Sequence, residues 1–278
     1  MIEKNNKGIT LIEILIGIVI TSIIMGAMLT SYNVVNGSYA QVIDKASIGN
    51  STRAFSEMLL RDIRMAGYKY FDDNLITTTE NEEGDDEMDV PILITKNTSD
   101  ECCDTITIIY GDFDRNLVDD KRYIRYKIQY SFQPNPKENG VFQILKSKQK
   151  WKDGDWSSPA EDRDTYTNEI VTDYISDIEI VAKDNIGNVI DPPPSLTNIN
   201  RDKLYSIYTV EIFLTYRSKK NFYKSKKKRT IVSLYNTKRN LEEDDKFLRE
   251  SIILSAFTRN LEAFRWKKNN RDLLWYYL

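Results

Sequence analysis

The chain has 278 residues, enough for one large domain or two small ones, each with a core. Its formal net charge of −3 gives no overall attraction to nucleic acid, and none is expected as a partner. It contains no histidine and only two cysteines, which are adjacent. This composition excludes catalysis by Ser-His-Asp or Cys-His arrangements, histidine zinc sites and CxxC redox motifs.

The N-terminus combines a short basic segment with a long apolar one. Residues 1–8 are polar and include Lys4 and Lys7, whereas residues 9–29 are almost entirely apolar. As a helix, the apolar run is about 31 Å long, which matches the hydrocarbon layer of a bilayer. The next basic residue is Lys45, so the positive charges predict a cytoplasmic N-terminus. Cleavage after Gly8 would leave the apolar anchor in place, unlike removal of a secretory signal.

Glu13 is the unexpected residue in this apolar run. A carboxylate inside a membrane-spanning helix costs about 3 kcal/mol on insertion scales. That cost falls if the carboxylate meets a positive charge at the same depth, and cleavage after Gly8 would create one, the α-amine of Ile9. Between axially staggered helices the two groups could meet directly. We therefore predict that Glu13 registers one subunit against another.

The segment GITLIEILIGIVITS, residues 8–22, resembles the leader and N-methylation motif of type IV pilins and related pseudopilins. The resemblance implies that prepilin peptidase cuts between Gly8 and Ile9, that Ile9 is N-methylated, and that Glu13 is the assembly carboxylate. Ile9 departs from the pattern, because Phe or Met is commoner there. The implied partners are prepilin peptidase, other major and minor pilins, the inner-membrane assembly platform and the bilayer.

The helix is predicted to continue past the membrane as residues 9–66. No proline occurs before Pro91, and apolar residues recur at steps of three and four from Val42 to Ala66. Gly67 is a natural stop. Residues 54–68, AFSEMLLRDIRMAGY, resemble the end of the first helix in minor pilins of the PilW family.

The rest of the chain is predicted to be rich in strands. Period-two patterns predict strands at 90–96, 104–110, 122–132, 141–149, 205–216 and from Arg229 to Tyr235, and residues 170–184 predict a helical turn followed by a strand. The expected fold class is α+β, with a long N-terminal helix packed on an antiparallel, pilin-like sheet. Residues 244–261 resemble the closing strand of the same minor pilins. Residues 262–278 depart from that family, and either fold back on the head or contact another subunit.

Two features of the head leave alternatives open. Cys102 and Cys103 could form a vicinal disulfide or remain reduced. Asp112, Asp114 and Asn116 match the start of a calcium loop, although the turn glycine and the closing glutamate are missing. A polar hairpin loop is therefore the favoured interpretation, and no cofactor is expected.

Two charge runs also have alternative interpretations. Residues 80–89 are acidic and residues 217–229 are basic. Such runs are usually solvated loops or strand ends, but they can also be surfaces on which a partner docks.

The predicted organisation is a leader, 1–8, a membrane and assembly helix, 9–66, and an extracytoplasmic head, 67–278, with its extension 262–278. The predicted function is that of a minor type IV pilin, PilW-like and not an enzyme, which takes part in pilus assembly or priming near the filament tip. It would lie in the inner membrane with its head outside, and then in the pilus. The alternatives are a minor pseudopilin of a type II secretion or DNA-uptake machine, or a membrane-tethered adhesin or enzyme.

Overall fold

The structure is a computed structural model that describes residues 8–68, 91–97, 102–113, 123–152, 155–157, 164–191, 206–231 and 241–261. The chain forms two compact units, Met1–Ser47 and Ile48–Leu278. The boundary between the units falls inside the N-terminal helix, so that each unit contains a part of it.

The N-terminal helix α1 runs from Leu11 to Met65. The prediction of a helix over residues 9–66 is thus confirmed to within two residues at each end. Gly67 ends it as expected, because its φ of 70° lies in the left-handed region that glycine adopts without steric cost. The Gly67 amide then donates to the Ile109 carbonyl at 2.9 Å, which ties the end of the helix to a strand.

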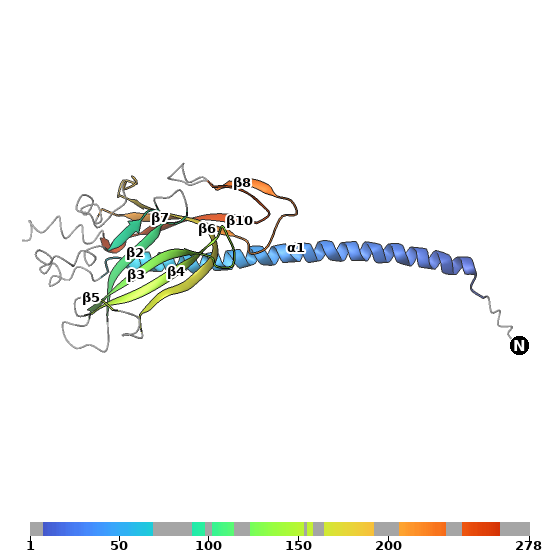
Figure 1. The fold of residues 1–278 in the computed structure, drawn as a ribbon, viewed down its shortest axis with the longest axis horizontal. Helices are drawn as coiled ribbons and strands as arrows, with labels where there is room; N and C mark the ends of the chain where they lie inside the picture. The colour runs from blue at the N-terminus through green and yellow to red at the C-terminus, as the bar shows by residue number, and fades with distance from the viewer. Residues whose placement is uncertain are drawn as a thin grey trace, which may run out of the picture. The chain divides into compact units, whose positions relative to one another are not determined.

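The second unit contains an antiparallel sheet with the strand order β1-β2-β3-β4-β6-β7-β10, in which β5 also pairs with β4, and a separate two-stranded ribbon, β8-β9 (Figure 1). The strands are β1 (Ile92–Thr95), β2 (Thr105–Phe113), β3 (Tyr123–Pro134), β4 (Phe142–Lys152), β5 (Asp155–Trp156), β6 (Tyr166–Lys183), β7 (Thr209–Arg217), β8 (Lys227–Ile231), β9 (Leu241–Asp245) and β10 (Arg249–Phe257). The predicted fold class, a long N-terminal helix with an antiparallel sheet, is confirmed.

Strand β6 corrects one expectation. The predicted helical turn near residue 170 is wrong, because Tyr166–Lys183 is a single strand. Its first half pairs with β4 and its second half with β7, so both halves find backbone partners in the sheet. The strand changes partner beside Tyr174, whose φ is 62°, and a register shift follows between Ile175 and Asp177. Pairing with two neighbours thus overrode a local pattern that fitted a turn.

Strand β9 was not predicted, because its sequence LEEDD lacks apolar alternation. It pairs with the basic strand β8, and the register places Lys227 opposite Asp245 and Lys228 opposite Asp244. Opposite charges on facing strands stabilise such a ribbon. Residues 232–235 of the strand predicted to follow Arg229 lie outside the described residues.

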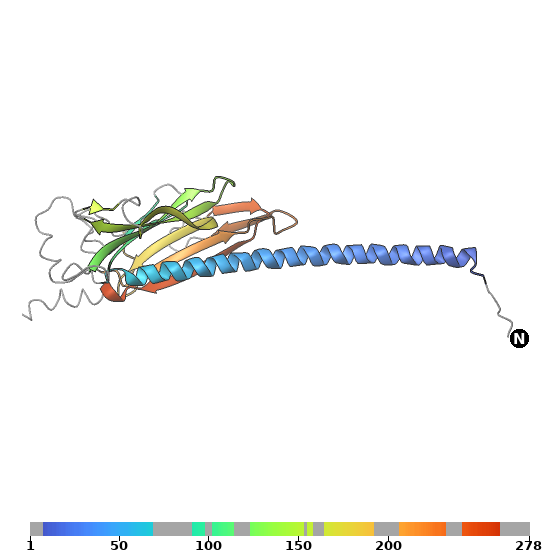
Figure 2. The same ribbon diagram turned by 90° about the horizontal axis from the view of Figure 1, so that it is seen from below.

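The second half of α1 lies along one face of the sheet and supplies part of its core (Figure 2). Phe55, Leu59 and Ile63 are buried and pack with isoleucines of β1, β2 and β3. Within the predicted apolar stripe, Val42 and Ile43 are exposed, so burial of the helix begins at Ile48.

A buried ion pair fixes the helix on the sheet. The Asp62 carboxylate accepts hydrogen bonds from Lys146 Nζ and from the Tyr130 hydroxyl, both at 2.6 Å. Both charged side chains are 7% exposed. Burial, and then the nearby Asp62 charge, raise the pKa of Tyr130 far above its usual value, so the hydroxyl stays protonated and donates. A buried pair of this kind specifies position more than it adds stability.

Candidate processing and assembly site

The N-terminus of α1 is closed by a capping box formed by Thr10 and Glu13. Thr10 immediately precedes the helix, and Glu13 is its third residue. Glu13 Oε2 accepts hydrogen bonds from the Thr10 amide at 2.8 Å and from the Thr10 hydroxyl at 2.9 Å. The carboxylate therefore satisfies one of the amides that a helix start leaves without a partner. The motif T-x-x-E is present in the sequence, but the role of Thr10 was not predicted.

The two oxygens of Glu13 are used differently. Oε2 is engaged by Thr10, whereas Oε1 accepts no hydrogen bond from the residues that the structure describes. A carboxylate offers about four acceptor positions, so one oxygen can cap its own helix while the other receives a second donor. Capping and pairing with another subunit are thus geometrically compatible roles for one side chain.

Gly8 lies just before the cap and is exposed. A Cβ added at Gly8 would meet no heavy atom within 4 Å, and its backbone has no left-handed φ. Within the part of the chain that the structure describes, neither packing nor backbone geometry therefore requires glycine there. If glycine is needed at this position, the requirement comes from a protein that acts on the segment.

The first half of α1 exposes apolar side chains around its whole circumference. Its large apolar residues from Leu11 to Ile43 are 47–80% exposed. Within the described residues, α1 is the one helix long and apolar enough to cross a membrane. A helix that is apolar all round fits a lipid environment or a bundle of similar helices, and not water.

Three hydroxyl side chains of this half donate hydrogen bonds to carbonyls of the helix itself. The Ser22 hydroxyl donates to the Ile18 carbonyl at 2.8 Å, and the Thr30 hydroxyl donates to the Gly26 carbonyl at 2.9 Å. Thr21 donates in the same way to the Gly17 carbonyl. Because hydrocarbon offers no hydrogen-bond partners, such internal bonds let serine and threonine lie inside a bilayer at low cost.

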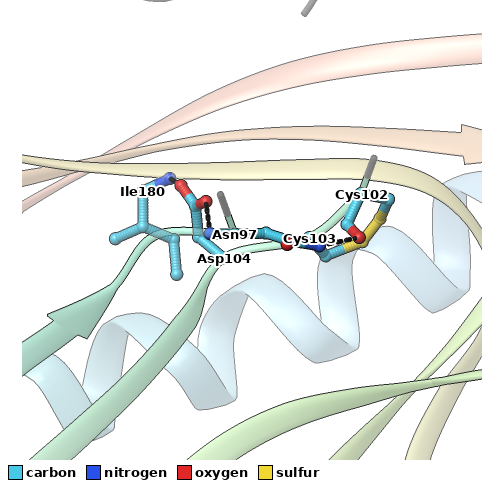
Figure 3. The surroundings of a disulfide bond; sticks show 5 residues. All are labelled: Asn97, Cys102, Cys103, Asp104 and Ile180. Carbon is cyan, nitrogen blue, oxygen red and sulfur yellow. Dashed lines mark hydrogen bonds between the residues drawn. A yellow bond between two sulfur atoms is a disulfide. The ribbon is translucent and has the colours of Figure 1, made fainter. Parts of the chain in front are cut away.

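The two cysteines form a vicinal disulfide, Cys102–Cys103, which resolves the alternative left open by the sequence. They lie just before β2, and Figure 3 shows that Asp104, the next residue, points away from the disulfide toward Ile180. Asn97 Nδ2 donates to the Cys102 carbonyl at 2.7 Å. The Asp104 carboxylate accepts from Lys96 Nζ at 2.7 Å and from the Ile180 amide at 2.9 Å, so this corner closes β6 against β1.

The alternative of a calcium loop at Asp112, Asp114 and Asn116 is not tested by the described residues. Asp112 lies in β2 opposite Ile124, at the end of a strand and not in a loop. Asp114 and Asn116 lie outside the described residues, as does the extension 262–278.

Comparison with known proteins supports the N-terminal interpretation. Residues 4–29 match the family model described as the prokaryotic N-terminal methylation motif. This range contains Gly8, Ile9 and Glu13, and the predicted motif is confirmed. No curated protein matches the chain.

A solved structure, a type IV-like pilin from Thermus thermophilus, is similar over 77% of this chain and 96% of that one, with 10% identity and a TM-score of 0.47. A similarity of that size carries no argument about function. The chain is type IV pilin-like because it has the N-terminal methylation motif and because a long N-terminal helix precedes an antiparallel sheet.

Proposed function

We propose that this chain is a minor type IV pilin of the PilW kind, which prepilin peptidase processes between Gly8 and Ile9. The observation that carries the proposal is the methylation motif at residues 4–29, set on a helix whose first half is apolar on every side. After cleavage, Ile9 would carry the N-methylated amine, and the helix would remain in the inner membrane with the N-terminus on the cytoplasmic side. The head would lie outside until the subunit enters a pilus.

Glu13 is the residue proposed to register subunits during assembly. Thr10 and Glu13 both survive cleavage after Gly8, so the capping box is available in the mature chain. The second oxygen of Glu13 would then accept the amine of Ile9 from a neighbouring, axially displaced helix. This pairing lowers the cost of a carboxylate in the membrane, because it places a positive charge at the same depth.

The large head and the PilW-like segments 54–68 and 244–261 support a minor subunit near the filament tip, where bulk is tolerated better than in a repeating lattice. Other major and minor pilins and the inner-membrane assembly platform would be its partners. The same motif also suits a minor pseudopilin of a type II secretion or DNA-uptake machine. Cleavage after Gly8 and the pairing of Glu13 would be the same in that machine. The motif and the fold favour a structural protein over an enzyme.

Processing is tested by the mass of the chain in cells with and without prepilin peptidase. We expect the peptidase to remove residues 1–8 and a methyl group to be added at Ile9. Gly8→Leu should block cleavage while leaving the head folded, because none of the described residues packs against Gly8. An unchanged mass of the wild-type chain in the presence of the peptidase would contradict the proposal.

The role of Glu13 is tested by comparing Glu13→Gln with Glu13→Ala. Glutamine keeps an oxygen that caps the helix but carries no charge, whereas alanine removes both. If charge pairing registers subunits, both variants are processed normally and both lose filaments. If Glu13 acts only as a cap, Glu13→Gln forms filaments like the wild type and Glu13→Ala does not.

A further inference from the structure

Thr10 binds the Glu13 side chain through two separate donors. The Thr10 amide and the Thr10 hydroxyl both donate to Glu13 Oε2, at 2.8 and 2.9 Å. The Thr10 hydroxyl also accepts from the Glu13 amide at 3.4 Å, and the Thr10 carbonyl accepts from the same amide at 3.1 Å. One residue thus fixes both the start of the helix and the position of one carboxylate oxygen.

The surrounding sequence offers no substitute for Thr10. Between Ile9 and Ile20 it has the only side chain that can donate a hydrogen bond, because the other residues are Glu13, a glycine and aliphatic residues. The next hydroxyls, those of Thr21 and Ser22, donate to carbonyls of the helix. Hydrocarbon supplies no donors either. Inside a bilayer, the side-chain donor that this segment offers to Glu13 is therefore the Thr10 hydroxyl.

Both donors are retained after the proposed cleavage. The cut between Gly8 and Ile9 leaves the peptide bond between Ile9 and Thr10 intact, so the Thr10 amide stays a donor. Methylation would occur on the Ile9 nitrogen and would change neither donor of Thr10. The mature chain therefore keeps both hydrogen bonds to Glu13 Oε2.

A Glu13 side chain without these donors would be freer to move. Charged side chains near the end of a membrane helix can turn toward the water at the bilayer surface, and the carboxylate would then lie at another depth than the amine that it should meet. Holding Oε2 removes this freedom before two subunits meet, so less entropy is lost when they pair. Oε1 accepts no hydrogen bond from the described residues, so it is the oxygen left for the amine.

We infer that Thr10 is the positioning residue for Glu13 in assembly. Its amide and hydroxyl hold Oε2, and this leaves Oε1 at the depth and in the orientation that the amine of a neighbouring subunit needs. The inference rests on the proposed function, in which Glu13 registers subunits. It goes further because it makes assembly depend on Thr10, which carries no charge and takes no part in the pairing itself.

Three substitutions separate the hydroxyl of Thr10 from the start of the helix. Thr10→Ser keeps the hydroxyl, whereas Thr10→Val removes it and keeps the shape of the side chain. Thr10→Gly also removes the hydroxyl, but glycine is well tolerated at the position before a helix and valine is not. All three variants keep the backbone amide.

Assembly is measured in cells as the fraction of the processed full chain that is recovered in sheared filaments. We expect Thr10→Ser to match the wild type. Thr10→Val and Thr10→Gly should be recovered about tenfold less, as the loss of one hydrogen bond to a charged group implies. Cleavage, followed by the mass of the chain, should be normal in all three variants, since the hydroxyl acts on Glu13 and not on the bond that is cut.

The contact itself is measured by nuclear magnetic resonance on the processed full chain in detergent micelles, where no filament is needed. The amide proton of residue 10 should resonate downfield in the wild type and in Thr10→Ser, because it donates to a carboxylate. It should move upfield in Glu13→Ala, which removes the acceptor. A resonance that is the same in the wild type and in Glu13→Ala would overturn the inference.

The three variants also give results that would overturn it. If Thr10→Gly enters filaments as well as Thr10→Ser does, the start of the helix accounts for the role of Thr10 without its hydroxyl. Equal recovery of Thr10→Ser and Thr10→Val would refute a role for the hydroxyl as well, and lost cleavage in Thr10→Val would assign Thr10 to processing. A wild-type chain that is not cleaved contradicts the proposed function, whereas any of these results with a cleaved wild type contradicts this inference alone.

Discussion

The two halves of α1 share one backbone but face different environments. From Leu11 to Ser47 the helix exposes apolar side chains on every side, and the hydroxyls of Thr21, Ser22 and Thr30 bond to its own carbonyls. From Ile48 to Met65 it exposes one face and buries the other against the sheet, where Lys146 satisfies its one buried carboxylate, Asp62. The first half is thus built for lipid or for other helices, and the second is built for this chain alone. Substitutions in the two halves should therefore have separable effects.

The largest effect is expected from Asp62→Ala, which leaves Lys146 buried without its counter-ion. Removing one partner of a buried pair lowers the free energy of unfolding by about 3–5 kcal/mol. Chemical unfolding of the full chain in detergent, followed by the fluorescence of Trp151 and Trp156 in the sheet, measures it. Adding Lys146→Met to the variant should recover part of the loss. A double variant less stable than Asp62→Ala would contradict the pairing.

A smaller effect is expected from Leu59→Ala, since Leu59 is fully buried and its loss leaves a cavity. We expect the free energy of unfolding of the head to fall by about 3 kcal/mol. Ile23→Ala is the matched control in the first half, because Ile23 is 67% exposed, and it should leave head stability unchanged. Equal losses in both variants, measured by the same unfolding assay, would show that the two halves are not energetically distinct.

The smallest effect is a dependence on alkaline pH. Because burial and the Asp62 charge raise the pKa of Tyr130, folding favours its neutral form. The stabilisation is complete below the unfolded pKa of about 10 and declines as pH rises above it, by up to about 1.4 kcal/mol per pH unit. Tyr130→Phe should make the loss of stability above pH 10 shallower, as measured by unfolding at several pH values. Tyr39→Phe, in the exposed half, should not change the profile. Identical slopes for all three proteins would refute the assignment.

The candidate site could be predicted from the sequence because the residues that define it are close together in the chain. Gly8, the apolar run and Glu13 lie within a few turns, and the family match covers the same residues. The role of Thr10 was not predicted, although T-x-x-E is a known capping pattern, because a threonine beside an apolar run is not unusual in the way that a carboxylate within it is. The helix and most strands could be predicted too, because the repeat of apolar residues every 3.6 positions in a helix and every two in a strand follows directly from backbone geometry.

The sequence by itself determined the long helix, its stop at Gly67, the membrane-compatible first half and the methylation motif. Tertiary structure alone decided where burial begins, because Val42 and Ile48 are both apolar but only the second meets the sheet. It also decided that residues near 170 join a strand and that LEEDD pairs with a basic strand. The pairing of Asp62 with Lys146, 84 residues apart in the chain, was likewise decided by the tertiary structure. Such contacts depend on which distant segments become neighbours in the folded chain. The local periodicity of apolar residues does not predict which segments these are.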